Sequence, residues 1–171
     1  HDRLSSAWLA VTDASLAEAV ASEVERQLKL LPRQEIARVS IEQNGRILVV
    51  DSLETAARLA DEIAPEHLEL CVDDPFGLLP MVHNAGSVFL GRSCPEPLGD
   101  YLAGPNHTLP TSGTARYSSP LGVDDFCRRS SYLYYTPDAL GQVSEDVMRF
   151  ARREGLDAHA NAVAVRMEGR S

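Results

Sequence analysis

Side chains that could carry out chemistry concentrate in four stretches of this 171-residue sequence. These are His1, the adjacent pair Glu66-His67, the segment from Asp100 to His107, and the segment from Glu154 to His159. Imidazole nitrogens and carboxylate oxygens are suitable zinc ligands, and histidine also titrates near neutral pH, so it can transfer protons. The residue types therefore indicate a metal site or acid–base catalysis if the fold brings these stretches together.

The same side chains also have ordinary structural interpretations. A histidine at a chain start is commonly solvated, and the Glu66-His67 pair can be turn polarity at a junction between a helix and a strand. Asp100 can cap a turn beside glycine and proline, and His107 can bond the backbone of its own loop. Sequence spacing alone is a weak metal signal, because the proposed ligands must meet in space.

The remaining polar positions are equally open to two interpretations. Glu154 and His159 flank Gly155, where a helix is expected to end, and charged residues there ordinarily stabilise a helix terminus. His83 lies in a short helical stretch without an acidic neighbour in the sequence, and we interpret it as a surface residue.

The segment GDYLAGPNHTLPT, residues 99–111, places an aspartate and a histidine among glycines and prolines. Glycine and proline interrupt helices and central strands, so we expect this segment to be a loop. Long loops in compact domains are usually functional or disordered. Constrained backbone geometry would hold Asp100 and His107 in place at a low ordering cost.

Strand-like and helix-like patterns alternate along the first part of the chain. Short apolar or β-branched runs predict four strands, at residues 8–12, 47–51, 68–72 and 87–91. Helical periodicity predicts a helix that is capped by Asp13 or Ser15 and ends at Pro32. It also predicts a second helix that Ser52 opens and Pro65 ends, and a short helical stretch at 78–83. This alternation predicts an α/β layer with a mostly parallel sheet.

The second part of the chain has a different character. Periodicity is absent from Gly91 to about Leu121, and a helix is predicted from Pro137 to Gly155. We therefore expect two parts, with residues 1–121 forming the α/β layer and carrying the catalytic and zinc residues, and residues 122–171 forming a mainly helical tail.

Composition excludes several classes of partner. Lys and Arg total 16 against 25 acidic residues, and the formal net charge of -9 disfavours binding to nucleic acid. No apolar run approaches the roughly 20 residues of a membrane-spanning helix, and no signal peptide is recognisable. The three cysteines are far apart and contain no C-x-x-C pair, which suits a reducing cytoplasm. The chain starts with His rather than Met, so we expect it to be a piece of a longer protein.

Four longer strings are distinctive: APEHLEL at 64–70, AGSVFLG at 85–91, GDYLAGPNHTLPT at 99–111 and EGLDAHANAV at 154–163. Together they resemble the carboxy-terminal half of the histidinol dehydrogenase family, and the similarity runs from His1 to Met167. The resemblance implies an incomplete Rossmann-like α/β layer followed by a dimerisation tail. It also implies that the chain lacks the family's amino-terminal half, which supplies most of the nicotinamide-cofactor site.

The resemblance further implies an activity and a zinc site. This family oxidises L-histidinol through histidinaldehyde to L-histidine in two NAD-dependent steps, with a zinc ion that holds the substrate. By similarity, the zinc ligands are His1, Asp100 and His159, and the neighbouring subunit of a homodimer donates His159. A further glutamine ligand would lie outside this chain. The metal then acts as a template for the substrate.

The family's catalytic pair is similar to Glu66-His67. By this similarity, His67 accepts the hydroxyl proton as hydride leaves the alcohol carbon, and Glu66 helps to activate the water that adds to the aldehyde. The substrate-binding residues implied by the resemblance are His67, Asp100, His107, Glu154 and His159. The cofactor-binding residues for NAD are unknown.

The Glu66-His67 pair conflicts with the usual geometry of an open sheet. If 68–72 is a parallel strand, the pair lies at its leading edge, whereas ligand sites usually gather at the trailing edges. Either the strand runs antiparallel or the strand assignment is wrong.

Two other functions are compatible with the sequence. One is a related zinc- and NAD-dependent dehydrogenase acting on another polar alcohol, such as a sulfonated diol. The four residues that favour histidinol, because they suit an amino alcohol bearing an imidazole, are Glu66, His67, His107 and Glu154. The other is a structural or dimerisation fragment that has no activity when isolated, because a dehydrogenase without its cofactor site cannot accept hydride.

Overall fold

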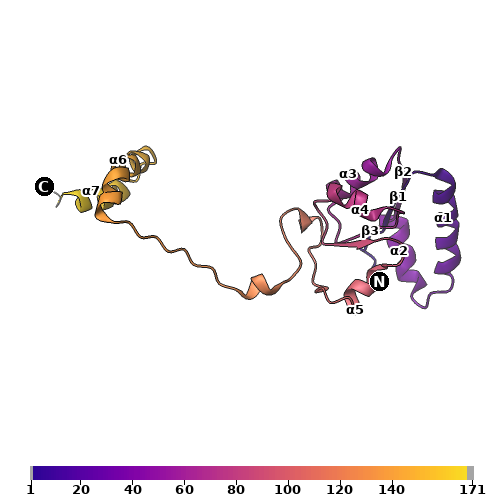
Figure 1. Cartoon of the computed structure of the whole chain (residues 1–171). Coiled ribbons are helices and arrows are strands. Elements are labelled where there is room, and N and C mark those ends of the chain that lie inside the picture. Colours follow the sequence, from indigo (N-terminus) through magenta and orange to yellow (C-terminus); the bar gives the residue numbers. More distant parts are fainter. Residues whose placement is uncertain (1, 169–171) are drawn as a thin grey trace. The chain divides into compact units, whose positions relative to one another are not determined.

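The protein, represented here by a computed structural model, is described for residues 2–168 and divides into two compact units, His1–Phe126 and Cys127–Ser171. The first unit is the α/β layer that the sequence predicts, and the second contains two helices (Figure 1). Within the described part of the chain, no helix is both long and apolar enough to cross a membrane.

The first unit alternates strands and helices in chain order. Its first six elements are β1 (Trp8–Val11), α1 (Ala14–Leu28), α2 (Gln34–Asn44), β2 (Arg46–Val49), α3 (Leu53–Ile63) and β3 (His67–Leu70). These are followed by α4 (Pro75–Leu78), η1 (Leu79–Met81), β4 (Ser87–Leu90), α5 (Glu96–Tyr101), η2 (Thr114–Arg116) and η3 (Val123–Phe126).

The four strands form two parallel pairs. Strand β1 pairs with β2, so that Trp8 lies opposite Arg46, and β3 pairs with β4, so that His67 lies opposite Ser87. The expectation of a mostly parallel sheet is confirmed. The suggestion that the strand after Glu66 runs antiparallel is wrong, because β3 is parallel to β4 and begins at His67.

Helix caps occur where the sequence predicts them. The Asp13 carboxylate accepts a hydrogen bond of 2.8 Å from the Ser15 N–H at the start of α1. The Ser52 hydroxyl accepts one of 3.1 Å from the Thr55 N–H at the start of α3. Such caps satisfy backbone donors that have no partner inside the helix.

Helix α2 was not predicted from the sequence. The helix turns Ser40 inward, where its hydroxyl donates a 2.7 Å hydrogen bond to the Ser5 carbonyl. A polar residue at a position facing the interior weakens the apolar periodicity that identifies helices in a sequence.

The apolar core of the first unit lies against one face of the β3–β4 pair. Its buried centre consists of Ala57 from α3, Leu70 from β3 and Leu78 from α4. Partly buried apolar side chains surround this centre: Leu68, Leu79, Met81, Val82, Val88 and Leu90. In Figure 1, α3 and α4 lie on one side of β3 and α5 lies on the other.

The second unit contains α6 (Pro137–Arg153) and α7 (Asp157–Met167), which pack against each other. The predicted stop at Gly155 is confirmed, since this residue has a φ of 74° and its N–H bonds to the Arg152 carbonyl. Such left-handed glycines end helices because they carry no Cβ.

Candidate functional site

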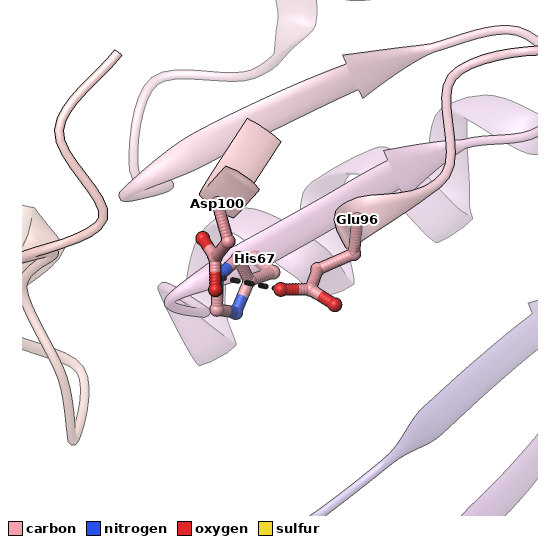
Figure 2. Close-up of side chains that lie close together, drawn as sticks. All are labelled: His67, Glu96 and Asp100. Atoms are coloured by element: carbon pink, nitrogen blue, oxygen red, sulfur yellow. Dashed lines mark ion pairs between the residues drawn. The ribbon is translucent and has the colours of Figure 1, made fainter. Parts of the chain in front are cut away.

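A histidine and two carboxylates meet on the face of β3 that is covered by α5. The Nε2 atom of His67 lies 3.5 Å from a carboxylate oxygen of Glu96 and 3.7 Å from one of Asp100 (Figure 2). One ligand atom from each residue can be chosen so that all three lie within 4.8 Å of one another. All three side chains are partly buried.

The end of helix α3 directs the chain into this site. Ala64 is fully buried and adopts a left-handed conformation with a φ of 53°, which ends α3 and turns the chain toward β3. The Glu66 carbonyl then accepts a 2.9 Å hydrogen bond from the Ser87 N–H, which aligns the starts of β3 and β4. His67 is therefore held at the amino end of a parallel strand.

Alternation along the strands decides which side chains face α5. Successive residues of a strand point to opposite faces, so Leu68 and Leu70 enter the apolar core while His67 and Glu69 face the other way. Phe89, which lies opposite Glu69 in the register, also faces α5, and its ring centroid is 5.9 Å from that of His67.

Helix α5 runs back along β3 and brings its carboxylates to His67. Its first N–H, from Glu96, donates a 2.8 Å hydrogen bond to the Glu69 carboxylate. Asp100 follows Glu96 by one helical turn and therefore lies nearer the start of the strand, beside His67. This antiparallel path explains how a site can form at the leading edge of a parallel strand.

The electrostatics of the cluster are unusual. Desolvation raises the pKa of Glu96 above its ordinary value, and the neighbouring Asp100 carboxyl raises it further. Nε2 of His67 is buried and has no hydrogen-bond partner, since both carboxylates are farther away than a hydrogen bond. Buried polar atoms in native proteins normally have a partner, so this nitrogen is suited to bind a proton, a substrate or a metal ion.

The structure brings together some of the residues predicted from the sequence. His67 and Asp100 lie in the same cluster, and Glu66 directly precedes His67. The prediction that Asp100 lies in a loop is wrong, because Asp100 lies in α5. Pro97 does not prevent this helix, since it occupies the first turn, where proline is tolerated. Residues 102–111 contain no helix or strand, and His107 is exposed there.

The end of the segment 102–111 packs close to the start of β3. Pro110 is buried and packs against Gly86, where an added Cβ would lie 2.6 Å from the Glu66 carbonyl oxygen and 3.1 Å from Pro110. Farther along, Arg116 donates hydrogen bonds to the carbonyls of Glu62 and Gly113. These contacts fix the segment that follows His107 against the start of β3.

Three other residues are predicted from the sequence to bind zinc or substrate: His1, Glu154 and His159. His1 lies outside the described residues. Glu154 is the C-terminal cap of α6 and His159 lies in the first turn of α7, and both are exposed in the second unit.

Sequence reasoning missed two acidic residues and one ion pair. Glu96 stands four residues before Asp100, and Glu69 two residues after His67, which are the spacings that share a helix face and a strand face. His83 is exposed, as predicted, and its Nδ1 lies 2.8 Å from an oxygen of the Asp61 carboxylate, an ion pair that the sequence did not indicate.

Comparisons with known proteins support the family resemblance that the four sequence strings indicate. Residues 1–167 match the family model described as histidinol dehydrogenase. The chain is 56% identical over 168 residues to the histidinol dehydrogenase of Bacillus cereus, covering 98% of this chain and 39% of that protein. It is 52% identical over 169 residues to the enzyme of Geobacter metallireducens, covering 99% of this chain and 39% of that protein.

A solved structure is similar to the whole fold. The crystal structure of histidinol dehydrogenase from Elizabethkingia anophelis aligns with a TM-score of 0.84 and 36% sequence identity, covering 99% of this chain and 39% of that chain. The chain thus spans about 39% of the length of the relatives that it matches.

Proposed function

The chain belongs to the histidinol dehydrogenase family, and on that premise we propose that it forms part of an enzyme that oxidises L-histidinol through histidinaldehyde to L-histidine. The proposal concerns a family-length enzyme containing this segment, because the chain spans about 39% of its relatives. The observation that carries it is the buried Nε2 of His67, which has no hydrogen-bond partner and faces two carboxylates on one face of β3.

His67 is proposed to act as the general base. Its Nε2, which has no hydrogen-bond partner, would take the proton from the substrate hydroxyl, and a bound NAD would supply the acceptor for the hydride of the alcohol carbon. The carboxylates of Glu96 and Asp100 lie within ion-pair distance of this nitrogen. Glu66, the preceding residue, is proposed to activate the water that adds to the aldehyde before the second oxidation.

Zinc is proposed to be held by Asp100, together with His1 and with His159 from a second subunit. The partly buried carboxylate of Asp100 is a suitable oxygen donor for this ion. A bound zinc ion would supply a positive charge that grips the substrate. His67 also has ligand geometry with Glu96 and Asp100, but a nitrogen bound to a metal cannot accept a proton, so we assign His67 to the chemistry.

The second unit is proposed to complete the active site of a partner subunit in a homodimer. Glu154 and His159 are exposed in their own unit, as groups offered to another chain must be. His107, exposed on the loop that follows α5, is proposed to contact the substrate. NAD is proposed to bind mainly to the remaining part of a family-length enzyme, and the location of that enzyme is proposed to be cytoplasmic.

A substrate panel tests the proposed function. A family-length enzyme containing this segment is expected to reduce two NAD per L-histidinol, and to oxidise histidinol in preference to a sulfonated diol or another polar alcohol. Preferential oxidation of a different alcohol would contradict the assignment.

The isolated 171-residue chain should not reduce NAD when supplied with histidinol and zinc. Appreciable turnover by the isolated chain would show that the remaining part of the enzyme is not required.

A further inference from the structure

We infer that Glu69 and Gly99 are positioning residues, which set how closely helix α5 lies against strand β3 and thereby hold Asp100 and Glu96 opposite Nε2 of His67. Neither residue has a role in the proposed reaction. The inference deepens the proposed function and rests on it for its kinetic readout.

Glu69 fixes the start of α5. The first N–H groups of a helix have no partner inside the helix, and Pro95, at the cap position, provides no side-chain hydrogen bond. The Glu69 carboxylate, 27 residues away in sequence, accepts the Glu96 N–H instead, at 2.8 Å. Hydrogen bonds to a charged acceptor are stronger than neutral ones, so strand β3 itself caps the helix.

Gly99 fixes the distance between α5 and the sheet. A Cβ at this position would lie 2.5 Å and 2.9 Å from two ring carbons of Phe89, which is far closer than van der Waals contact. Phe89 is 4% exposed, so its ring cannot move aside without displacing the atoms that cover it. Gly99 is not among the glycines with positive φ, so close approach, not backbone conformation, requires a glycine here.

The two contacts act on one face of one short helix. Glu96, Gly99 and Asp100 follow the i, i+3, i+4 spacing and so share the face toward the sheet. Helix α5 has only six residues. Displacing either contact therefore changes the distance between the two carboxylates and the imidazole.

Substitutions at Gly99 provide the principal test, in a family-length enzyme containing this segment. Gly99→Ala should lower kcat by about 10²-fold, the loss typical of a displacement of about 1 Å at an active site. Adding Phe89→Leu to this variant makes room for the new methyl group and should recover at least about tenfold. Gly122→Ala is the matched control, because Gly122 has an ordinary φ and its Cβ would meet nothing closer than 3.9 Å.

Substitutions at Glu69 provide an independent test. Glu69→Ala removes the acceptor and should lower kcat about tenfold, whereas Glu69→Gln keeps an acceptor oxygen for the Glu96 N–H and should restore most of that loss. A merely structural role would not separate these two variants. Comparing kcat with KM, and both with the thermal midpoint, distinguishes misplacement from unfolding.

Two results would overturn the inference: wild-type kcat in Gly99→Ala, or equal impairment of Glu69→Gln and Glu69→Ala. If the wild-type enzyme fails to oxidise histidinol, the proposed function is wrong. The crystal structure of Gly99→Ala then decides the inference separately, since α5 must be displaced from Phe89 if the inference is correct and must remain in place if it is not.

Discussion

The two faces of the β3–β4 pair serve different purposes although they are built from the same eight strand residues. One face carries Leu68, Leu70, Val88 and Leu90 and packs against α3 and α4. The other carries His67, Glu69 and Phe89 and packs against α5. Adjacent residues in the chain therefore contribute to stability on one side and to the candidate site on the other.

The energetic consequences of the two faces are opposite. Burying a leucine side chain such as Leu70, which is 5% exposed, stabilises the fold by about 1.5–3 kcal/mol. On the other face, desolvation disfavours the charged form of Glu96, and Nε2 of His67 is buried without a partner. The candidate site is thus on the face where the buried polar groups disfavour stability, as is common at active sites.

The largest expected effect concerns the α5 face, where His67 is the proposed base and Asp100 the proposed zinc ligand. In a family-length enzyme, His67→Ala should slow the chemical steps by roughly 10²–10⁴-fold and leave zinc bound, because a lost general base has this cost. Asp100→Ala should instead reduce zinc content and substrate binding. Metal analysis together with kcat separates the two roles. Unchanged zinc in Asp100→Ala, or complete loss of zinc in His67→Ala, would reverse the assignments.

On the apolar face, Leu70→Ala should lower the free energy of unfolding by about 2–5 kcal/mol, since it leaves a cavity between α3 and α4. Denaturant unfolding of the 171-residue chain measures the change. Leu4→Ala is the control, because Leu4 is 87% exposed and its loss should change stability by less than about 0.5 kcal/mol. Equal effects of the two substitutions would mean that this face does not form the core.

Substitution of Asp61, which attaches α3 to the segment before β4, should lower stability less than Leu70→Ala does. One oxygen of the Asp61 carboxylate accepts the N–H groups of His83 and Asn84, at 2.6 Å and 2.9 Å. Asp61→Asn keeps one acceptor oxygen but removes the negative charge and the second oxygen that faces Nδ1 of His83. It should therefore reduce the free energy of unfolding at neutral pH by about 1–2 kcal/mol, because the remaining hydrogen bonds have a neutral acceptor. Glu18→Gln, at an exposed position of α1, is the control.

The same carboxylate predicts a dependence of stability on pH. Desolvation raises the pKa of Asp61, but the hydrogen bonds from His83 and Asn84 outweigh it, so the folded pKa lies below the ordinary value. The stabilisation is therefore present above the unfolded pKa of about 3.9 and is lost as pH falls through the folded pKa. Unfolding curves of the wild type and Asp61→Asn should converge in acid. A constant difference between them at all pH values would contradict this explanation.

The smallest expected effect belongs to Glu96 in the metal-free protein. Its folded pKa is raised by desolvation and by Asp100, so its contribution to stability is present below the unfolded pKa of about 4.3 and is lost as pH rises through the folded pKa. Glu96→Gln should therefore increase stability at neutral pH, by less than about 1 kcal/mol because the side chain is 34% exposed. Thermal unfolding at neutral and acidic pH measures this change, and a loss of stability at neutral pH would show that Glu96 stabilises the fold.

Much of the fold could be predicted from local patterns. The runs at β1 and β3, the caps Asp13 and Ser52, and the left-handed Gly155 each depend on residues close together in sequence. Helices α2 and α5 could not be predicted in this way. A buried serine interrupts the apolar pattern of α2, and α5 contains a proline and a glycine whose ordinary effect is to break helices.

The sequence by itself determined the family, through long strings such as GDYLAGPNHTLPT, and the α/β class of the first unit, through the alternation of strand-like and helix-like patterns. Only the tertiary structure decided that Glu96 joins His67 and Asp100, and that the site forms at the leading edge of a parallel strand. The reason is that this meeting depends on contacts between distant residues, the Glu69 cap on α5 and the approach of Gly99 to Phe89, which leave no periodic signal along the chain.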